Sequence, residues 1–286
     1  TYNKIPARAV PCSELYYFPQ AYLGDRKVLV LPITRKSTTT EVRMAIDKVH
    51  TFPNVKSLSI TCDSGSAEYN DYMILVPDLD EKSVIMTSSF TSMCYLTIIL
   101  AMYVGGKKDL IDAMKDYKKV SEDILSKMDA LAKKVMEENK NINLFITLGQ
   151  GVYYGVANEC MNKIKEMSLS NTEAYYSMEY RHGLMSLVDD NTLIVSLCHL
   201  DAMKNEASII KEMKGYGATT LAIGEDVSKK IPDADYTLDL PGQYNNEQYA
   251  AIIGFIGQFI GYYAAELKDL DADSPRHLSQ AIVLDD

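Results

Sequence analysis

The sequence predicts an α/β protein built from two repeated units, each a parallel sheet sandwiched between layers of helices. Three observations support this prediction. Short, continuous runs of Val, Ile and Leu alternate with segments of helical period, as expected for parallel strands buried on both faces. A motif at residues 71–77 recurs at residues 235–241. The length of 286 residues also suits about two domains of ~150 residues.

The first half has the order strand, helix, strand. The expected strands are residues 27–33 (KVLVLPI), 55–61 and 72–76. Between the first two, residues 39–50 place apolar side chains on one helical face. These side chains are Val42, Ala45, Ile46 and Val49. Residues 87–104 predict a long apolar helix. Because strands alternate with helices, we expect the strands to run parallel.

Residues 107–140 are charged and helical in period, and we expect a helical connector whose charges lie on solvated faces. The alternation of strands and helices then restarts. Strands are expected at 144–148, 192–197, 219–223 and 236–240, and helices at 152–167, 205–214 and from about residue 247.

An internal repeat relates the two halves. The motif Asp-Tyr-x4-Pro occupies residues 71–77 and recurs at 235–241, and a helix-opening glutamate precedes each copy, Glu41 and Glu206. We therefore expect one domain at 1–138, which includes the connector from about residue 107, and a second at 139–286.

The second copy opens with a strand and a glycine turn at residues 149–151, and the offset of the repeat places their counterparts before residue 1. We therefore expect the first copy to lack its opening strand and glycine turn. Either the natural chain is longer or the sequence in hand omits its front, and we favour the second. The strand at 27–33 would otherwise leave an apolar sheet edge open.

Composition excludes several classes of protein. The formal charge of −10 and the pI of about 5.0 argue against a general nucleic-acid binder, which needs a basic surface. The five cysteines are dispersed and form no CxxC pair, which indicates reduced thiols in a cytoplasmic protein. Residues 249–267 barely reach the ~20 apolar residues of a membrane span, and we predict a buried core helix whose glycines allow close packing.

Residues 34–41 (TRKSTTTE) lie between a buried strand and the start of a helix. Hydroxyl groups, backbone N–H groups and the positive end of the helix dipole meet there, which favours an anion. Arg35 and Lys36 add charge suited to a phosphate. The alternative is that one threonine is only a helix N-cap in a polar loop. Because ligands of open α/β sheets bind at this edge, we predict a phosphate site.

Gly149-Gln150-Gly151 follows a strand and opens a helix, but it lacks the third glycine of a dinucleotide fingerprint, so no NAD is predicted. Glu166 and His182 lie on adjoining segments and could serve as general base and acid, although lone histidines are often structural. The other histidines show no ligand grouping and no HExxH spacing occurs, so we predict neither a metal nor a cofactor.

Five segments spread over nearly the whole chain carry a family resemblance. They are ITRKSTTTE at 33–41, SVIMTSSFTSM at 83–93, GQGVYYGVANECMNKIKEMS at 149–168, EYRHG at 179–183 and QFIGYYAAELKDLDADSPRHLSQ at 258–280. With these segments the chain resembles tandem sugar isomerase (SIS) domain proteins. Among these, it resembles the isomerase half of glutamine–fructose-6-phosphate aminotransferase and the amino-sugar-6-phosphate deaminase/isomerases. The resemblance implies two flavodoxin-like domains, each a three-layer α/β/α sandwich, and a homodimer with shared sites.

The resemblance also implies roles for individual residues. The family's Ser-x-Ser-Gly-x-Thr phosphate loop falls on Thr34, Arg35, Lys36, Ser37, Thr38 and Thr39. Thr34 and Thr39 keep hydroxyl groups, whereas Lys36 replaces the second serine and Ser37 the glycine.

The catalytic positions of the family fall on the second half. Glu166 corresponds to the glutamate that moves a proton between C1 and C2, and Lys163 to the lysine beside it. His182 corresponds to the histidine of ring opening, which reaches the site of a neighbouring subunit. The family's Schiff-base lysine falls on Gln280, which cannot form an imine.

These correspondences imply a cytoplasmic phosphosugar aldose–ketose isomerase. Because Gln280 excludes the imine and the 286 residues include no glutaminase domain, we expect an amino-sugar-6-phosphate deaminase/isomerase. Two alternatives stay open: a deglycase of fructosamine 6-phosphates, and a non-catalytic phosphosugar sensor. The expected partners are a small sugar phosphate and a second copy of the chain, with no nucleic acid and no membrane.

Overall fold

The computed structural model describes residues 5–76, 79 and 81–284, and it divides into two compact units. The first contains residues up to 108 together with the tail from 277, and the second contains residues 109–276. The connector therefore groups with the second unit and the tail with the first, whereas the sequence placed the domain boundary after residue 138. Pro77, which ends the first copy of the repeated motif, lies outside the described residues.

The sheet of the first unit is parallel throughout. Strands β1 (Val28–Val30) and β2 (Ile33–Thr34) pair with one edge of β3 (Val55–Thr61), and β4 (Tyr72–Leu75) pairs with the other. The predicted strand at 27–33 is thus one strand interrupted at Pro32, whose carbonyl still accepts from Ile60 N at 2.9 Å. Proline has no N–H to donate, so it is tolerated at such an edge.

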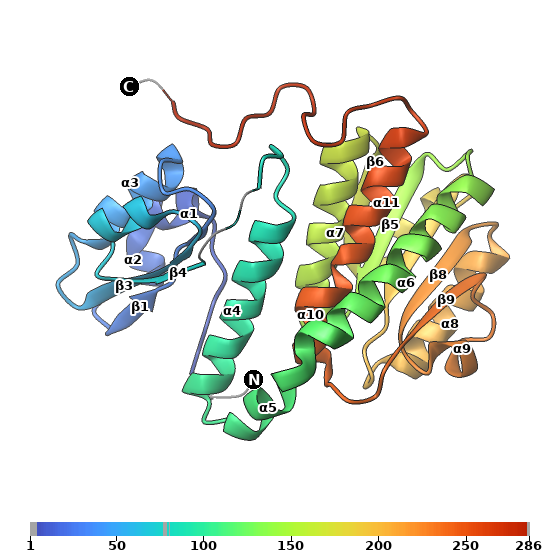
Figure 1. The fold of residues 1–286 in the computed structure, drawn as a ribbon, viewed down its shortest axis with the longest axis horizontal. Coiled ribbons are helices and arrows are strands. Elements are labelled where there is room, and N and C mark those ends of the chain that lie inside the picture. Colours follow the sequence, from blue (N-terminus) through green and yellow to red (C-terminus); the bar gives the residue numbers. More distant parts are fainter. Residues whose placement is uncertain (1–4, 77–78, 80, 285–286) are drawn as a thin grey trace. The chain divides into compact units, whose positions relative to one another are not determined.

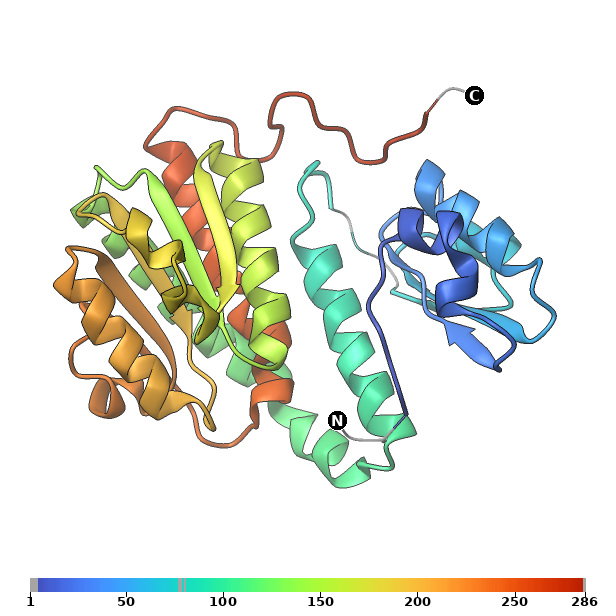
Figure 2. The same ribbon diagram turned by 180° about the vertical axis from the view of Figure 1, so that it is seen from behind.

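Helices cover both faces of this sheet (Figures 1 and 2). The four side chains predicted for the buried face of α3 (Thr40–Val49) are the buried ones, and part of that face packs with Leu15 and Val55. The apolar helix α4 (Ser88–Val104) packs its Met93 against Ile60 on the other face. The sequence did not predict the short helices α1 (Cys12–Tyr17) and α2 (Pro19–Tyr22).

The second unit has a five-stranded parallel sheet in the order β6-β5-β7-β8-β9. Its strands are β5 (Leu144–Gly149), β6 (Asn171–Tyr176), β7 (Thr192–Leu197), β8 (Thr219–Glu225) and β9 (Tyr236–Leu240). Four were predicted. The edge strand β6 was not, because its NTEAYY sequence is partly exposed and carries no continuous apolar run.

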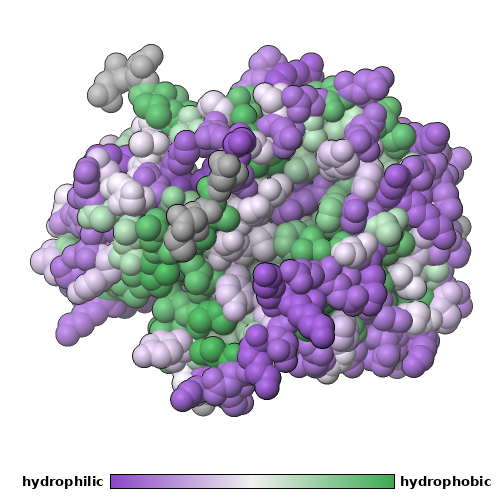
Figure 3. Space-filling view, viewed as in Figure 1, coloured by the Kyte–Doolittle hydropathy of each residue, from purple (hydrophilic) through white to green (hydrophobic). Residues whose placement is uncertain are grey.

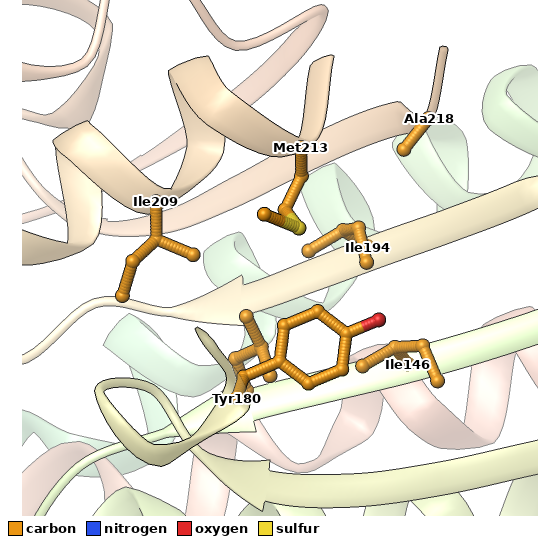
Figure 4. Close-up of a cluster of buried hydrophobic side chains, with 7 residues drawn as sticks. Ile146, Tyr180, Ile194, Ile209, Met213 and Ala218 are labelled. Carbon is orange, nitrogen blue, oxygen red and sulfur yellow. The ribbon is translucent and has the colours of Figure 1, made fainter. Parts of the chain in front are cut away.

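Two layers of helices enclose this sheet. One face carries α6 (Tyr117–Glu138), α7 (Val152–Ser168), α10 (Asn246–Ile253) and α11 (Phe255–Glu266), and the other carries α8 (Met203–Gly215) and α9 (Val227–Lys230) (Figure 1). Figure 4 shows the apolar cluster on the α8 face, where Ile146 and Ile194 of the sheet meet Ile209 and Met213. This arrangement is the predicted three-layer α/β/α sandwich.

Glycines allow α11 to lie directly on α7. A Cβ atom at Gly257 would be 2.4 Å from Cys160 Cα, and one at Gly261 would be 3.0 Å from the Lys163 carbonyl oxygen. The apolar stretch 249–267 is therefore a pair of core helices, as predicted from its glycines. Within the described residues, no helix combines the length and the apolar character that a membrane crossing requires.

The two sheets repeat one arrangement. In both, a carboxylate at the start of the last strand accepts from a backbone N–H of the neighbouring strand: Asp71 from Ser57 at 2.9 Å, and Asp235 from Thr220 at 2.9 Å. Strand β7 of the second sheet is the counterpart of β1 in the first. Strand β7 pairs with β5 on its other edge, whereas β1 has no such neighbour among the described residues. Leu29 is accordingly 53% exposed and its counterpart Leu193 is 0% exposed. Figure 3 shows hydrophobic residues gathered on the first unit.

Candidate functional site

The predicted phosphate loop lies at the carboxyl end of β2, directly before α3. Its hydroxyls are partly turned inward, since Thr34 Oγ1 donates to the Lys36 carbonyl at 2.9 Å and Thr39 Oγ1 to the same oxygen at 3.4 Å. Thr39 occupies the N-cap position of α3 without a side-chain capping bond. Lys36 is exposed at the surface of the loop.

Two carboxylates balance the positive charge of this loop. Arg35 is buried and its Nη1 lies 3.0 Å from Glu81 Oε2. Ser37 donates its backbone N–H to Asp63 Oδ2 at 3.0 Å. Burial opposes the ionisation of both acids, but the hydrogen bonds they accept lower the pKa of Glu81 and of Asp63. Arg35 therefore supports the loop internally, and Lys36 carries the exposed charge.

Neither acid was among the site residues predicted from the sequence. Asp63 had a usable signal, because it follows the strand 55–61 by two residues and so lies at the same sheet edge as the loop. Glu81 had none. It is brought to Arg35 by the fold and also accepts from the backbone N–H of Thr87 at 2.8 Å and of Ser89 at 3.1 Å, at the start of α4.

Gln280, on the tail of the first unit, contacts this loop. Its Oε1 accepts from Lys36 Nζ at 2.8 Å, and its backbone carbonyl accepts from Arg35 Nη2 at 3.1 Å. Two residues on, the Ile282 carbonyl accepts from Thr40 N at 3.1 Å. The tail thus occupies one N–H donor at the N-terminus of α3 and holds the Lys36 side chain.

The second group of predicted residues lies on α7 in the second unit. Glu166 is partly exposed, and both of its oxygens are held: Oε2 lies 2.8 Å from Lys163 Nζ, and Oε1 accepts from Asn162 Nδ2 at 3.1 Å. Lys163 is buried, with 4% of its side chain exposed, and its Nζ also lies 3.5 Å from Glu159 Oε1. A partly exposed carboxylate fixed by a buried ammonium can accept a proton from a bound molecule.

His182 does not join this group within one chain. Its neighbour Tyr180 packs in the apolar cluster on the α8 face, and Arg181 Nε lies 2.6 Å from Glu212 on α8. Glu166 is on α7, which covers the opposite face of the sheet (Figure 1). The sheet therefore separates His182 from Glu166.

Residues 139–267 match the SIS domain family. This part of the chain is a SIS domain. Over 285 residues the chain is 29% identical to a glutamine–fructose-6-phosphate aminotransferase [isomerizing] of Sulfurisphaera tokodaii, covering 99% of this chain and 46% of that protein. The chain thus spans about half the length of this curated relative.

Solved structures match both units of the chain. A glucosamine-6-phosphate deaminase from Thermotoga maritima shares 26% identity at a TM-score of 0.79, covering 98% of this chain and 83% of that one. A tagatose-6-phosphate ketose/aldose isomerase from Escherichia coli has the same fold at 20% identity, with a TM-score of 0.80 and coverage of 97% and 77%. The predicted fold is confirmed, and so is a SIS domain over residues 139–267.

The edge of the SIS domain sheet that corresponds to the phosphate loop holds a buried acid. After β7, His199 N donates to Glu206 Oε2 at 2.9 Å, and Ser177 Oγ donates to Glu206 Oε1 at 3.0 Å. Glu206 is 0% exposed, and burial raises its pKa to about 7. An internal carboxylate therefore takes up donors at this edge that could otherwise bind an anion.

Glu206 makes the stability of the SIS domain pH-dependent. Its pKa is about 7 in the folded chain and 4.5 when unperturbed, so folding favours its protonated form and stability falls as the pH rises through this window. Replacing Glu206 with glutamine should remove this loss, about 3 kcal/mol at 1.4 kcal/mol per pKa unit.

The test of this prediction is the thermal midpoint between pH 5.5 and 8.5. The Glu206→Gln midpoint should rise relative to wild type as the pH increases, whatever constant offset the substitution adds. The exposed Glu122→Gln is the matched control and should follow wild type. A constant difference between Glu206→Gln and wild type across this range would contradict the prediction.

Proposed function

We propose that this protein is a phosphosugar aldose–ketose isomerase of the amino-sugar-6-phosphate deaminase type. The observation that carries the proposal is the Glu166 carboxylate of the SIS domain, partly exposed and held by Lys163 and Asn162. Similarity to the Thermotoga deaminase over 98% of the chain supports the choice of substrate class.

In this proposal Thr34, Lys36 and Thr39 bind the 6-phosphate. Ser37, whose N–H and hydroxyl both donate to Asp63, supports the loop together with Arg35 and Gln280. Glu166 is the base, Lys163 orients it, and His182 assists ring opening from a neighbouring copy in a homodimer. Placement of His182 and Glu166 on opposite faces of one sheet supports the use of a second copy.

The reaction requires one base and a stabilised enediol-type intermediate. Glu166 takes the C2 proton of the open-chain 2-amino aldose, and the electron pair forms the C1–C2 double bond of an enolamine as the C1 oxygen gains a proton. Return of a proton to C1 gives a C2 imine. Water adds to this imine and ammonia leaves, so the products are the ketose 6-phosphate and one ammonia.

Proton NMR in D2O tests the proposal on a panel of hexose, hexosamine and fructosamine 6-phosphates. We expect exchange at C1 or C2 and release of ammonia from one hexosamine 6-phosphate. Exchange without ammonia would identify a plain isomerase, and amine release from a fructosamine 6-phosphate a deglycase. Saturable binding with no exchange would identify a non-catalytic phosphosugar sensor. Gln280, which replaces the family's lysine, favours this alternative.

A further inference from the structure

Three charged side chains form one stripe along α7, and the proposed mechanism uses only two of them. Glu159, Lys163 and Glu166 are spaced by four and three residues, so they share a helical face. Lys163 Nζ lies between the two acids, 3.5 Å from Glu159 and 2.8 Å from Glu166. One buried ammonium thus faces two carboxyl groups.

Glu159 is the more enclosed of the two acids. Its side chain is 11% exposed and that of Glu166 is 26% exposed. Glu159 Oε1 lies 3.5 Å from Lys163 Nζ, a longer contact than the 2.8 Å between Lys163 and Glu166. A buried carboxyl with one weak partner is costly to ionise. Its pKa is accordingly raised to about 7, because burial outweighs the attraction of Lys163.

The charges that act on Glu159 come from its own helix. The elements packed against α7 carry the following titratable groups: Glu247 and Tyr249 on α10, Tyr262, Tyr263 and Glu266 on α11, and Glu173, Tyr175 and Tyr176 on β6. Only Lys163, which favours the carboxylate, and Glu166, which opposes it, influence the ionisation of Glu159. The state of Glu159 therefore depends on the same lysine that holds the proposed base.

We infer that Glu159 is a positioning residue, which competes with Glu166 for the Lys163 ammonium and so sets how tightly Lys163 binds the base. The inference rests on the proposed role of Glu166. When Glu159 is protonated, Lys163 is drawn only to Glu166. When Glu159 ionises, the ammonium is shared and Glu166 is freer to take a proton, so turnover rises with pH.

The experiment measures kcat for proton exchange from pH 5.5 to 8.5 in wild type, Glu159→Gln, Lys163→Met and the double variant. Wild-type kcat should rise with an inflection near pH 7. At pH 8, the kcat of Glu159→Gln should be about tenfold lower than that of wild type, a loss typical of residues that orient a functional group. Its KM should stay within twofold of the wild-type value, and its pH profile should lack the inflection.

Because Glu159 acts through Lys163, adding Glu159→Gln to Lys163→Met should change kcat by less than about twofold. The exposed Glu137→Gln on α6 is the matched control and should behave as wild type. Independent, additive effects of the two substitutions, or an inflection that survives in Glu159→Gln, would overturn the inference.

A second measurement needs neither activity nor a folded Glu159 variant. Carbon-13 NMR of the glutamate carboxyls in the whole chain should show Glu159 titrating near pH 7, and at higher pH in Lys163→Met. An unshifted titration in Lys163→Met overturns the inference even in an active enzyme. A wild type inert to every sugar phosphate overturns the proposed function, whereas the expected NMR shift would still establish the Glu159–Lys163 coupling.

Discussion

Replacing Glu166 with glutamine should slow proton exchange at C1 and C2 by about 10²- to 10⁴-fold, the usual contribution of a positioned general base. The amide keeps the size of the carboxylate and can still accept a hydrogen bond from Lys163 or Asn162, which now hold the carboxylate at 2.8 and 3.1 Å. It cannot take up the proton. The sugar phosphate should therefore bind with its KM changed by less than about threefold.

The matched control is Glu266→Gln on α11, an exposed glutamate whose Oε1 accepts from Tyr262 at 2.8 Å. It should exchange the sugar proton at the wild-type rate. Wild-type exchange by Glu166→Gln would show that another group is the base. Equal losses of exchange and of phosphosugar binding would show that Glu166 serves binding and not proton transfer.

Replacing Gly257 with alanine should destabilise the second unit by about 3 kcal/mol, at the upper end of overpacking costs. The new methyl group would lie 2.4 Å from Cys160 Cα, which is backbone and cannot move aside without separating α11 from α7. For a unit of this size the thermal midpoint should fall by about 6–12 °C.

Gly155→Ala on α7 is the control for this substitution. Gly155 is exposed and helical, and a Cβ there would meet nothing within 4 Å. This change should stabilise the unit by about 0.5–1 kcal/mol, because alanine loses less conformational freedom in a helix. A similar fall in both midpoints would mean that the contact at Gly257 is not the cause.

Local pattern was enough to predict the repeated strands and their helices. The apolar side chains of α3 face the core because a helix repeats every 3.6 residues. Strand β7 was bounded correctly because it is buried throughout and its sequence is largely a continuous apolar run. Strand β6 lies at an edge, where most of its side chains are partly or fully exposed, so its sequence shows neither a continuous apolar run nor an alternating pattern. The short helices before residue 23 have too few turns to show one.

The candidate site was predictable where spacing along one element decides contact. Lys163 and Glu166 are three residues apart on a helix, and Glu159 could have been found by the same rule. The partner of Arg35 could not, because Glu81 is 46 residues away and only the fold brings it there. The separation of His182 from Glu166 follows from which face of the sheet the chain crosses after β6, which local sequence does not encode.

The separation of His182 from Glu166 bears on how the specific activity depends on protein concentration. The residues before His182 pack against α8 and Glu166 lies on α7, so under the proposed function the chemistry that uses both residues needs two chains. Turnover per milligram would then fall on dilution, as pairs dissociate, and recover on concentration. Specific activity that stays constant down to nanomolar protein, with sedimentation showing single chains, would mean that His182 is dispensable.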